Sequence, residues 1–269
     1  IVYYISPQIW AWKAKRIHLI KKCIDVMAVI LPFEKEIYKR AHVPVSFVGH
    51  PLVEKITAVS NTASQRRALN LPLDARIFAL LPGSRDHEIE RHMPILRDTA
   101  KLLHQQSPDL QFIIPIASTI NTKKVAQYFS KSTLPVTFVQ EQALSCMAAA
   151  DFVIVASGTA SLECALLEKP MCIIYKSSFL TYVLAAKLIK VKFLGLCNLL
   201  SNKMIVPEFL QYDCNPGELH KYITQFLNDK MQQEHMLERL ATLKDSLSEE
   251  KSDGSLFSLI ENQLFEKNA

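Results

Sequence analysis

The sequence predicts a doubly wound α/β fold with parallel sheets. Its expected strands are short apolar runs without polar alternation, which is typical of strands buried on both faces. Most of these runs are followed by a segment of helical period, so strands and helices alternate along the chain. Two expected strands end in polar turns that contain glycine, and folds of this class bind ligands at the carboxyl ends of their strands.

A first domain is expected over residues 1–54. Its strands are predicted at residues 1–5, 25–31 and 45–48, and its helices at 10–23 and 33–41. Gly49-His50-Pro51-Leu52 then ends the pattern, because Pro51 restricts His50 to an extended backbone. We expect the domain boundary just after this segment.

A second α/β domain is expected over residues 55–215. After a helical run at 64–69, strands are predicted at 76–81, 111–115, 136–139, 152–156 and 171–175, and helices at 86–106, 121–129, 143–149 and 162–167. Residues 216–269 are amphipathic with mixed charges, and we expect them to form helices that pack back across the two domains.

The turn Ser157-Gly158-Thr159 lies between an apolar strand and a helix. This arrangement directs backbone N–H groups and the positive end of a helix dipole at a ligand above the sheet, which favours phosphate. Glu163, one turn into the helix, suits sugar hydroxyls, as the acidic residue does in nucleotide-binding folds. An ordinary strand–turn–helix with a Ser/Thr cap and an acid in the first turn is the alternative.

A second polar turn, Pro82-Gly83-Ser84-Arg85, ends the strand at 76–81. Gly83 allows close backbone approach, Ser84 can cap the following helix, and Arg85 can grip phosphate bidentately. An exposed capping turn with a solvated Arg85 is the alternative. Two such turns on one sheet would flank a diphosphate, with Arg85 offsetting charge on the leaving group.

The charge of the chain agrees with several classes of binding partner. The net charge of +5 and the pI near 8.8 fit an anionic ligand, an anionic membrane surface or nucleic acid. Nucleic acid is disfavoured, because basic residues are not interleaved with stacking aromatics. The six cysteines form no CxxC pair and no Cys/His spacing typical of a metal site, so we expect no metal and no cofactor.

The stretch 177–200 is apolar with lysines spaced along it, including Lys187, Lys190 and Lys192. An interfacial helix with its lysine heads at a lipid surface explains this pattern, and so does a core helix with snorkelling lysines. Asn198 is a polar group in a stretch that should be buried, so it needs a partner from the backbone or from a ligand.

Five motifs occur in order along the chain: residues 4–12 (YISPQIWAW), 47–52 (FVGHPL), 81–85 (LPGSR), 156–163 (ASGTASLE) and 198–200 (NLL). In these motifs the chain resembles the lipid-A-disaccharide synthases, the family 19 glycosyltransferases of Gram-negative bacteria. The resemblance covers essentially the whole chain, including Tyr175-Lys176 and Val206-Pro207-Glu208.

The resemblance implies a GT-B architecture, in which two Rossmann-like domains face a cleft and the second holds the nucleotide. It implies a hexosyltransferase that moves 2,3-diacylglucosamine from its UDP derivative to 2,3-diacylglucosamine 1-phosphate (lipid X), giving the disaccharide 1-phosphate and UDP. It also implies a peripheral enzyme on the cytoplasmic face of the bacterial inner membrane that needs no metal. Whether the chain forms a homodimer is left open by the resemblance.

The resemblance also implies roles for individual residues. Arg85 would bind the UDP diphosphate and act in catalysis, in a loop shaped by Gly83 and Ser84. The helix-end contacts to phosphate would come from Ser157, Gly158 and Thr159, and Glu163 would bind the ribose hydroxyls. The remaining expectations are Gln142 near the uracil or the sugar, Asn198 as a catalytic residue in the cleft, and His50 near the hinge, where a structural histidine fixed by Pro51 is the alternative.

One departure from the family pattern concerns the general base. In the family, the acidic residue proposed for this role precedes the Ser6-Pro7-Gln8 motif, and none of the acids in this chain matches it. We therefore expect an N-terminally truncated chain with an incomplete first domain. The alternatives are a folded but inert UDP-sugar-binding fragment that lacks the general-base loop, and another UDP-sugar GT-B enzyme such as an epimerase.

Overall fold

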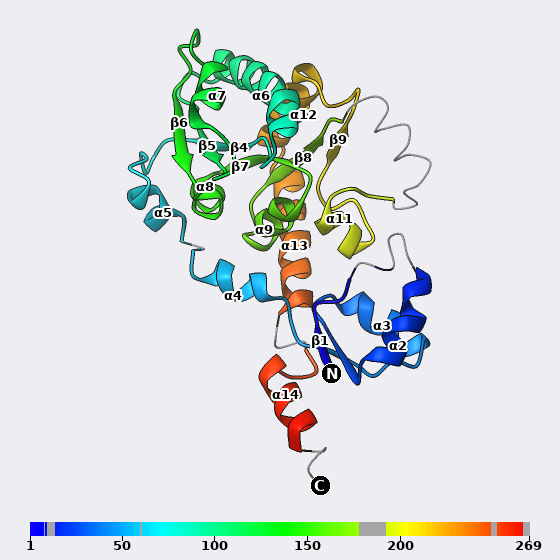
Figure 1. The fold of residues 1–269 in the computed structure, drawn as a ribbon. Helices are drawn as coiled ribbons and strands as arrows, with labels where there is room; N and C mark the ends of the chain where they lie inside the picture. Colours follow the sequence, from blue (N-terminus) through cyan, green and yellow to red (C-terminus); the bar gives the residue numbers. More distant parts are fainter. Residues whose placement is uncertain (8, 10–13, 60, 178–191, 249–251, 266–269) are drawn as a thin grey trace.

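The computed structural model describes residues 1–7, 9, 14–59, 61–177, 192–248 and 252–265. Within them the chain forms a three-stranded sheet and a six-stranded sheet, and every strand pair is parallel (Figure 1). The prediction of an α/β fold with parallel sheets is confirmed.

The small sheet is built from the first part of the chain. Its order is β1 (Val2–Tyr4), β2 (Val26–Val29) and β3 (Val45–Phe47), with η1 (Ala14–Arg16), α2 (Ile17–Cys23) and α3 (Pro32–Arg40) between the strands. Tyr38 is buried against the sheet, and its hydroxyl lies 2.8 Å from Ser6 Oγ. Of the helix predicted at 10–23, residues 10–13 lie outside the described residues.

The large sheet carries the order expected of a nucleotide-binding fold. Its strands run β6 (Val136–Gln140), β5 (Gln111–Ile116), β4 (Ile77–Leu81), β7 (Phe152–Ala156), β8 (Met171–Tyr175) and β9 (Glu208–Leu210). Numbered from β4 as the first strand, this is the order 3-2-1-4-5-6. The switch point, at which the strand order reverses, lies between β4 and β7. Every residue of β4 and β7 is buried, so both faces of the sheet are covered there.

The covering helices pack in groups. α6 (Asp86–Gln106) lies beside α12 (Pro216–Asn228), while α8 (Ala143–Ala149) contacts α5 (Thr62–Ala68) and α9 (Thr159–Leu166). The other helices are α4 (Pro51–Thr57), α7 (Thr122–Gln127), α11 (Leu196–Ser201), α13 (Lys230–Leu247) and α14 (Leu256–Phe265).

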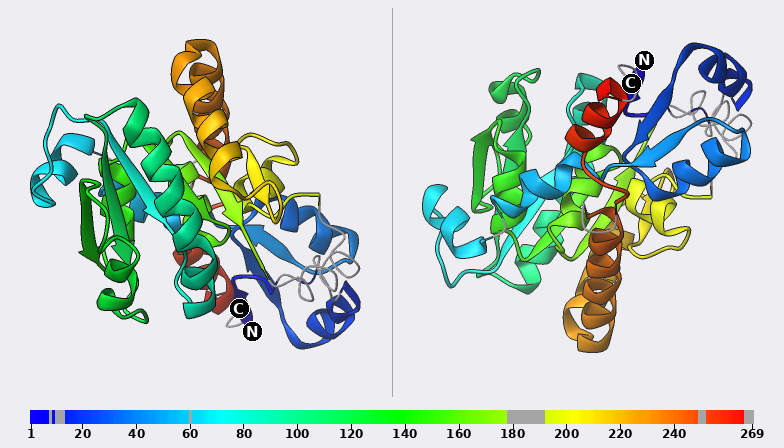
Figure 2. Two further views of the ribbon diagram at one scale, coloured as in Figure 1. Left: turned by 90° about the horizontal axis from the view of Figure 1, so that it is seen from above. Right: turned by 90° about the horizontal axis from the view of Figure 1, so that it is seen from below.

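The small sheet with α2 and α3 forms a lobe beside the large sheet (Figure 2). α13 packs against α9 and α11 and ends next to this lobe, where Leu247 O accepts a hydrogen bond of 3.0 Å from His50 N–H. Asp253 then accepts the N–H of Phe47 at 2.8 Å and pairs with Lys35. The end of the described chain is therefore bonded to the small sheet.

Three predictions need correction or lie outside the description. Pro51, taken as the end of a pattern, is the first residue of α4, and α9 begins at Thr159 rather than at Leu162. The short strand β9 was not predicted. Of the apolar stretch 177–200, residues 178–191, which include Lys187 and Lys190, lie outside the described residues. None of the described helices combines the length and hydropathy needed to cross a membrane.

Candidate functional site

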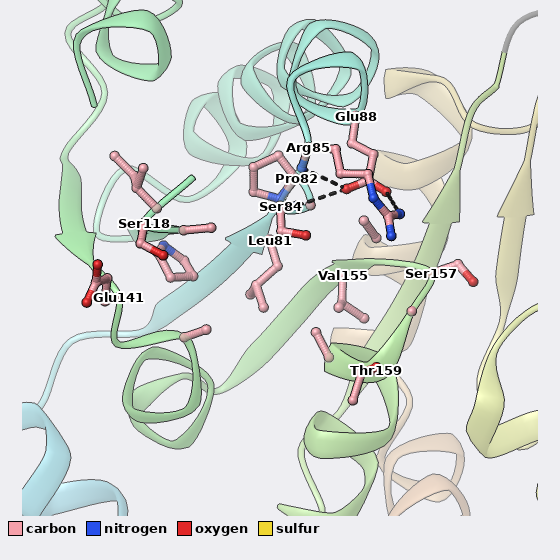
Figure 3. Close-up of a pocket in the computed structure, with 18 residues that line it drawn as sticks. Leu81, Pro82, Ser84, Arg85, Glu88, Ser118, Glu141, Val155, Ser157 and Thr159 are labelled. Carbon is pink, nitrogen blue, oxygen red and sulfur yellow. Dashed lines mark hydrogen bonds and ion pairs between the residues drawn. The ribbon is translucent and has the colours of Figure 1, made fainter. Parts of the chain in front are cut away.

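A pocket lies at the switch point of the large sheet, where the strand order reverses. β4 and β7 are paired neighbours, with Leu80 opposite Ile154 and Leu81 opposite Val155, so the turns that follow them leave the same edge of the sheet. The pocket has a volume of about 600 Å³ and lies between these turns (Figure 3). Its lining consists of residues 81–85, Glu88, 115–118, Glu141, Ala143 and 155–160.

The turn after β4 is shaped around a carboxylate. Gly83 has φ +115°, a backbone conformation that L side chains rarely adopt. Glu88 Oε2 accepts the N–H groups of Ser84 at 2.8 Å and of Arg85 at 3.1 Å, and Glu88 Oε1 accepts from Arg85 Nη1 at 3.1 Å. The side chain of Arg85 is 70% exposed and the side chain of Glu88 is 16% exposed. The turn therefore presents a guanidinium to the pocket while the carboxylate sits against its backbone.

His92 braces the same turn from inside the protein. Its ring is buried on α6, with Nδ1 2.7 Å from Pro82 O and Nε2 3.0 Å from the backbone nitrogen of Lys176. Because a peptide N–H can only donate, Nε2 accepts and Nδ1 carries the proton. Burial lowers the pKa of His92, which favours this neutral form. The neutral ring thus links the ends of β4 and β8.

The turn after β7 offers main-chain donors. Gly158, with φ +156°, precedes α9, and the space that a Cβ would occupy there is open. In the part of the chain that the structure describes, no acceptor binds the N–H groups of Thr159 and Ala160. They lie at the positive end of α9, which favours an anion. The Ser157 hydroxyl instead donates to Leu194 O at 3.0 Å.

Two further predicted residues lie near the pocket without lining it. Glu163 is half-buried on α9, where burial raises the pKa of its carboxyl and the charge of Lys55 opposes that rise. Gln142 is exposed at the start of α8, between Glu141 and Ala143, which do line the pocket.

The amide of Asn198 finds its partners within the protein. Its side chain is fully buried, and Nδ2 donates to Val206 O and to Glu208 Oε1, both at 2.8 Å. Its Oδ1 accepts the N–H groups of Ile205 at 2.8 Å and Val206 at 3.0 Å. These four contacts hold the chain that enters β9 and use both donors and the acceptor oxygen of the amide, while the catalytic role of Asn198 stays a prediction.

His50 lies between the two sheets and away from the pocket. Its backbone is extended, as predicted, and its Nδ1 accepts the N–H of Leu52 at 3.2 Å, which caps α4. Burial lowers the pKa of His50 to about 4. These contacts fit the structural alternative considered for this residue.

Sequence reasoning missed several pocket residues, namely Glu88, the 115–118 segment after β5 and Glu141 after β6. The signal that could have found the two segments is the parallel sheet itself, because all its strands end at the same edge. Glu141 also has φ +60°, an uncommon conformation for a residue with a side chain. Among the described residues, no group of three or more His, Cys, Asp or Glu side chains is placed to hold a metal ion.

The strand order is that of a Rossmann-type domain, and a pocket lies at its switch point with an arginine on one side and a helix N-terminus on the other. The family model described as lipid-A-disaccharide synthetase matches residues 1–260. The chain belongs to this family, and its reaction class is hexosyl transfer in lipid A biosynthesis.

Curated relatives agree with this assignment. The chain is 69% identical to lipid-A-disaccharide synthase 1 of Legionella pneumophila (strain Lens) over all 269 residues, which cover 70% of that protein. It is 39% identical to the lipid-A-disaccharide synthase of Geobacter sulfurreducens over 247 residues, which are 92% of this chain and 64% of that protein.

Solved structures share the fold. MnaA from S. aureus, solved with UDP, aligns with a TM-score of 0.55 and 14% identity over 87% of this chain and 59% of its own. A putative UDP-N-acetylglucosamine 2-epimerase from Listeria monocytogenes aligns with a TM-score of 0.58 and 11% identity over 82% and 56%. The predicted GT-B type fold is confirmed.

Proposed function

We propose that the pocket between the β4 and β7 turns binds the diphosphate of a UDP-sugar donor. The observation that carries this proposal is that Arg85 and the N-terminus of α9 line one pocket at the switch point of the sheet. Arginine keeps its charge at any working pH and can bind phosphate oxygens in pairs. The N–H groups of Thr159 and Ala160 supply further donors.

The donor is UDP-2,3-diacylglucosamine and the acceptor is lipid X, so the products are the lipid A disaccharide 1-phosphate and UDP. As the bond to the diphosphate breaks, negative charge grows on the departing UDP. Arg85 and the positive end of α9 stabilise that charge because they are already in place beside it. This part of the reaction needs no proton transfer by the pocket residues.

The nucleoside occupies the margin of the pocket. Glu163 accepts hydrogen bonds from the ribose hydroxyls, and Gln142 contacts the uracil or the sugar. Their positions on α9 and at the start of α8 support these roles, since both residues are next to segments that line the pocket. Residues 1–54 form the acceptor-side domain, 55–215 the nucleotide domain, and 216–269 the helices that pack across both.

Calorimetry with UDP tests the nucleotide site. The unaltered chain is expected to bind UDP, and Arg85→Ala is expected to weaken binding by about 1.5–3 kcal/mol, which is the range for hydrogen bonds to charged groups. Arg67→Ala removes an exposed arginine from α5 and is the matched control. Unchanged UDP affinity in Arg85→Ala would place the site elsewhere.

A transfer assay tests the reaction itself. The chain is incubated with UDP-2,3-diacylglucosamine and radiolabelled lipid X, and formation of the disaccharide 1-phosphate is followed by chromatography. Disaccharide formation supports the full proposal. UDP binding without disaccharide would leave this chain with nucleotide binding alone, as in the inert-fragment alternative.

We also propose that the chain contacts an anionic membrane surface, on the cytoplasmic face of the inner membrane. η1 and α2 support this, because α2 has no buried residue and the Leu19 side chain is 64% exposed among basic neighbours. Those neighbours are Lys15, Arg16, Lys21 and Lys22. A short helix of this kind can lay its apolar side chain among lipids while the cations meet the headgroups.

Flotation with vesicles separates this surface from the lysines of the 177–200 stretch. Binding to anionic vesicles is expected to fall when Leu19, Lys21 and Lys22 are replaced by Ser, and vesicles of neutral lipid are expected to bind weakly throughout. Replacing Lys187, Lys190 and Lys192 by Ser is the parallel variant. Undiminished binding by the α2 variant would reject α2 as the contact surface.

A further inference from the structure

In the turn after β4, backbone groups of Pro82, Ser84 and Arg85 form hydrogen bonds with side chains of the protein. Glu88 takes the N–H groups of Ser84 and Arg85, Thr119 Oγ1 donates to Ser84 O at 2.7 Å, and Pro82 O is bound by His92. On this side of the pocket, the main chain therefore offers no free donor from Ser84 or Arg85. From these two residues, what remains for an anion is the side chain of Arg85 and the hydroxyl of Ser84.

The carboxylate that takes these donors also holds the arginine. One oxygen of Glu88 binds two backbone N–H groups and the other binds Arg85 Nη1 (Figure 3). A guanidinium has five N–H donors, and this contact uses one of them. Arg85 is thus held at its base and along one edge, while most of its donors stay available to a ligand.

Gly83 is matched to this arrangement. A Cβ at position 83 would lie 2.8 Å from Glu88 Cβ and would also overlap the Glu88 carboxylate. The positive φ of Gly83 and the absence of its side chain let the carboxylate lie flat against the turn. The contact of the Glu88 carboxylate with the turn therefore requires glycine at position 83, five residues earlier in the sequence.

We propose that Glu88 is a positioning residue for diphosphate binding, which acts by holding the Arg85 guanidinium and the turn in the orientation that the ligand needs. This inference rests on the proposed function. An exposed arginine loses much side-chain freedom when it binds, and a carboxylate that already restricts it reduces that loss. The charge of Glu88 also repels a diphosphate, so the proposal requires that orientation outweighs repulsion.

UDP and uridine binding to matched variants test this balance. Glu88→Ala is expected to weaken UDP binding about tenfold, because the arginine and the turn lose their tether, and to leave uridine binding unchanged. Glu88→Gln is expected to lie between Glu88→Ala and the unaltered protein, since its amide oxygen can still accept a backbone N–H. Glu90→Gln is the control, because Glu90 lies on the same helix, pairs with Lys124 at 2.8 Å and does not line the pocket.

A double-mutant cycle makes the test independent of how well Glu88→Ala folds. If Glu88 acts through Arg85, the loss of UDP affinity on Glu88→Gln should be clearly smaller in an Arg85→Ala background, where only its support of the turn and its repulsion of the ligand remain. An equal effect in both backgrounds would overturn the inference, and so would unchanged or tighter UDP binding by both Glu88 variants. Failure of the unaltered protein to bind UDP would instead overturn the proposed function, and the role of Glu88 with it.

Discussion

Two histidines, the buried His92 and the partly buried His50, stabilise the fold by accepting backbone hydrogen bonds as neutral rings. His92 joins the ends of β4 and β8, and His50 caps α4. Burial lowers the pKa of each ring, which means that the folded protein binds protons less readily at these positions than the unfolded chain does. Both residues should therefore make the stability depend on pH.

For His50 the pH range can be stated. The folded pKa is about 4 and the unfolded value is 6.5, so the stabilisation is present above 6.5 and is lost as the pH falls toward 4. Between pH 7 and pH 5 this residue should account for a loss of about 1–2 kcal/mol in the free energy of unfolding. His50→Asn should lose less over the same range, because Asn can cap α4 without titrating.

Urea unfolding at pH 7 and pH 5 measures this difference. His92 and the carboxyl groups titrate in both proteins, so their contributions cancel in the comparison. Equal losses of stability in the unaltered protein and in His50→Asn would contradict a neutral His50 with a lowered pKa.

Single-residue roles were predictable only where a local pattern fixes the environment. The sequence identified Arg85 and Gly158 because each belongs to the turn that follows a buried strand, and the structure brings both to one pocket. The partners of Asn198 were not predictable, since Val206 and Glu208 come from the chain that leads into β9. Nothing in the local pattern distinguishes an amide that binds a ligand from one that binds the protein.

Helices and strands were predictable where the apolar period is long or the run is uniform. The bounds predicted for α6, α8, β7 and β8 match the structure. α4 was missed because Pro51 was taken as a break, although proline is favoured at the first position of a helix. β9 was missed because it is a three-residue edge strand that starts with a charged residue, so it carries little apolar signal.

One buried arginine joins α5 to the starts of two central strands. Arg66 donates to the carbonyls of Ala149 (2.9 Å), Leu73 (2.7 Å) and Ala75 (3.1 Å), and to Asp151 Oδ2 at 2.8 Å. That same oxygen accepts the N–H of Ile77 at the start of β4. The side chain of Arg66 is 7% exposed and that of Asp151 is 44% exposed, so water screens only one end of the pair.

Arg66→Leu should therefore be strongly destabilising. It removes a donor from three carbonyls and the cation from Asp151, which keeps only the N–H of Ile77, and we expect a loss of about 2–4 kcal/mol in the free energy of unfolding. Arg67→Leu is the control, because Arg67 is exposed on the same helix and should change stability by less than about 0.5 kcal/mol. Chemical denaturation of both variants measures the difference, and similar values would show that the Arg66 contacts contribute little.

The arrangement of the two lobes depends on the end of the described chain. The last residue of α13, Leu247, accepts the N–H of His50, and Asp253 then accepts the N–H of Phe47 in the last strand of the small sheet. Residues far apart in sequence thus attach the small lobe to a helix that packs on α9 and α11 beside the large sheet. The domain division at residues 54 and 215 stays a prediction, but these bonds make the C-terminal segment part of the connection.

Asp253 is the residue through which this connection can be tested. Burial works against its ionisation, but hydrogen bonds from Lys35 and from Phe47 N–H outweigh burial and lower the pKa of the carboxyl. Its contribution is present above the unfolded pKa and is lost as the pH falls through the lower folded value. At pH 7, Asp253→Asn should therefore raise the hydrogen-exchange rate of the Phe47 amide, because a neutral acceptor replaces a charged one. Lys35→Gln should raise it less, since the bond to Phe47 remains, whereas unchanged protection of Phe47 in Asp253→Asn would mean that the small sheet is held in place without this contact.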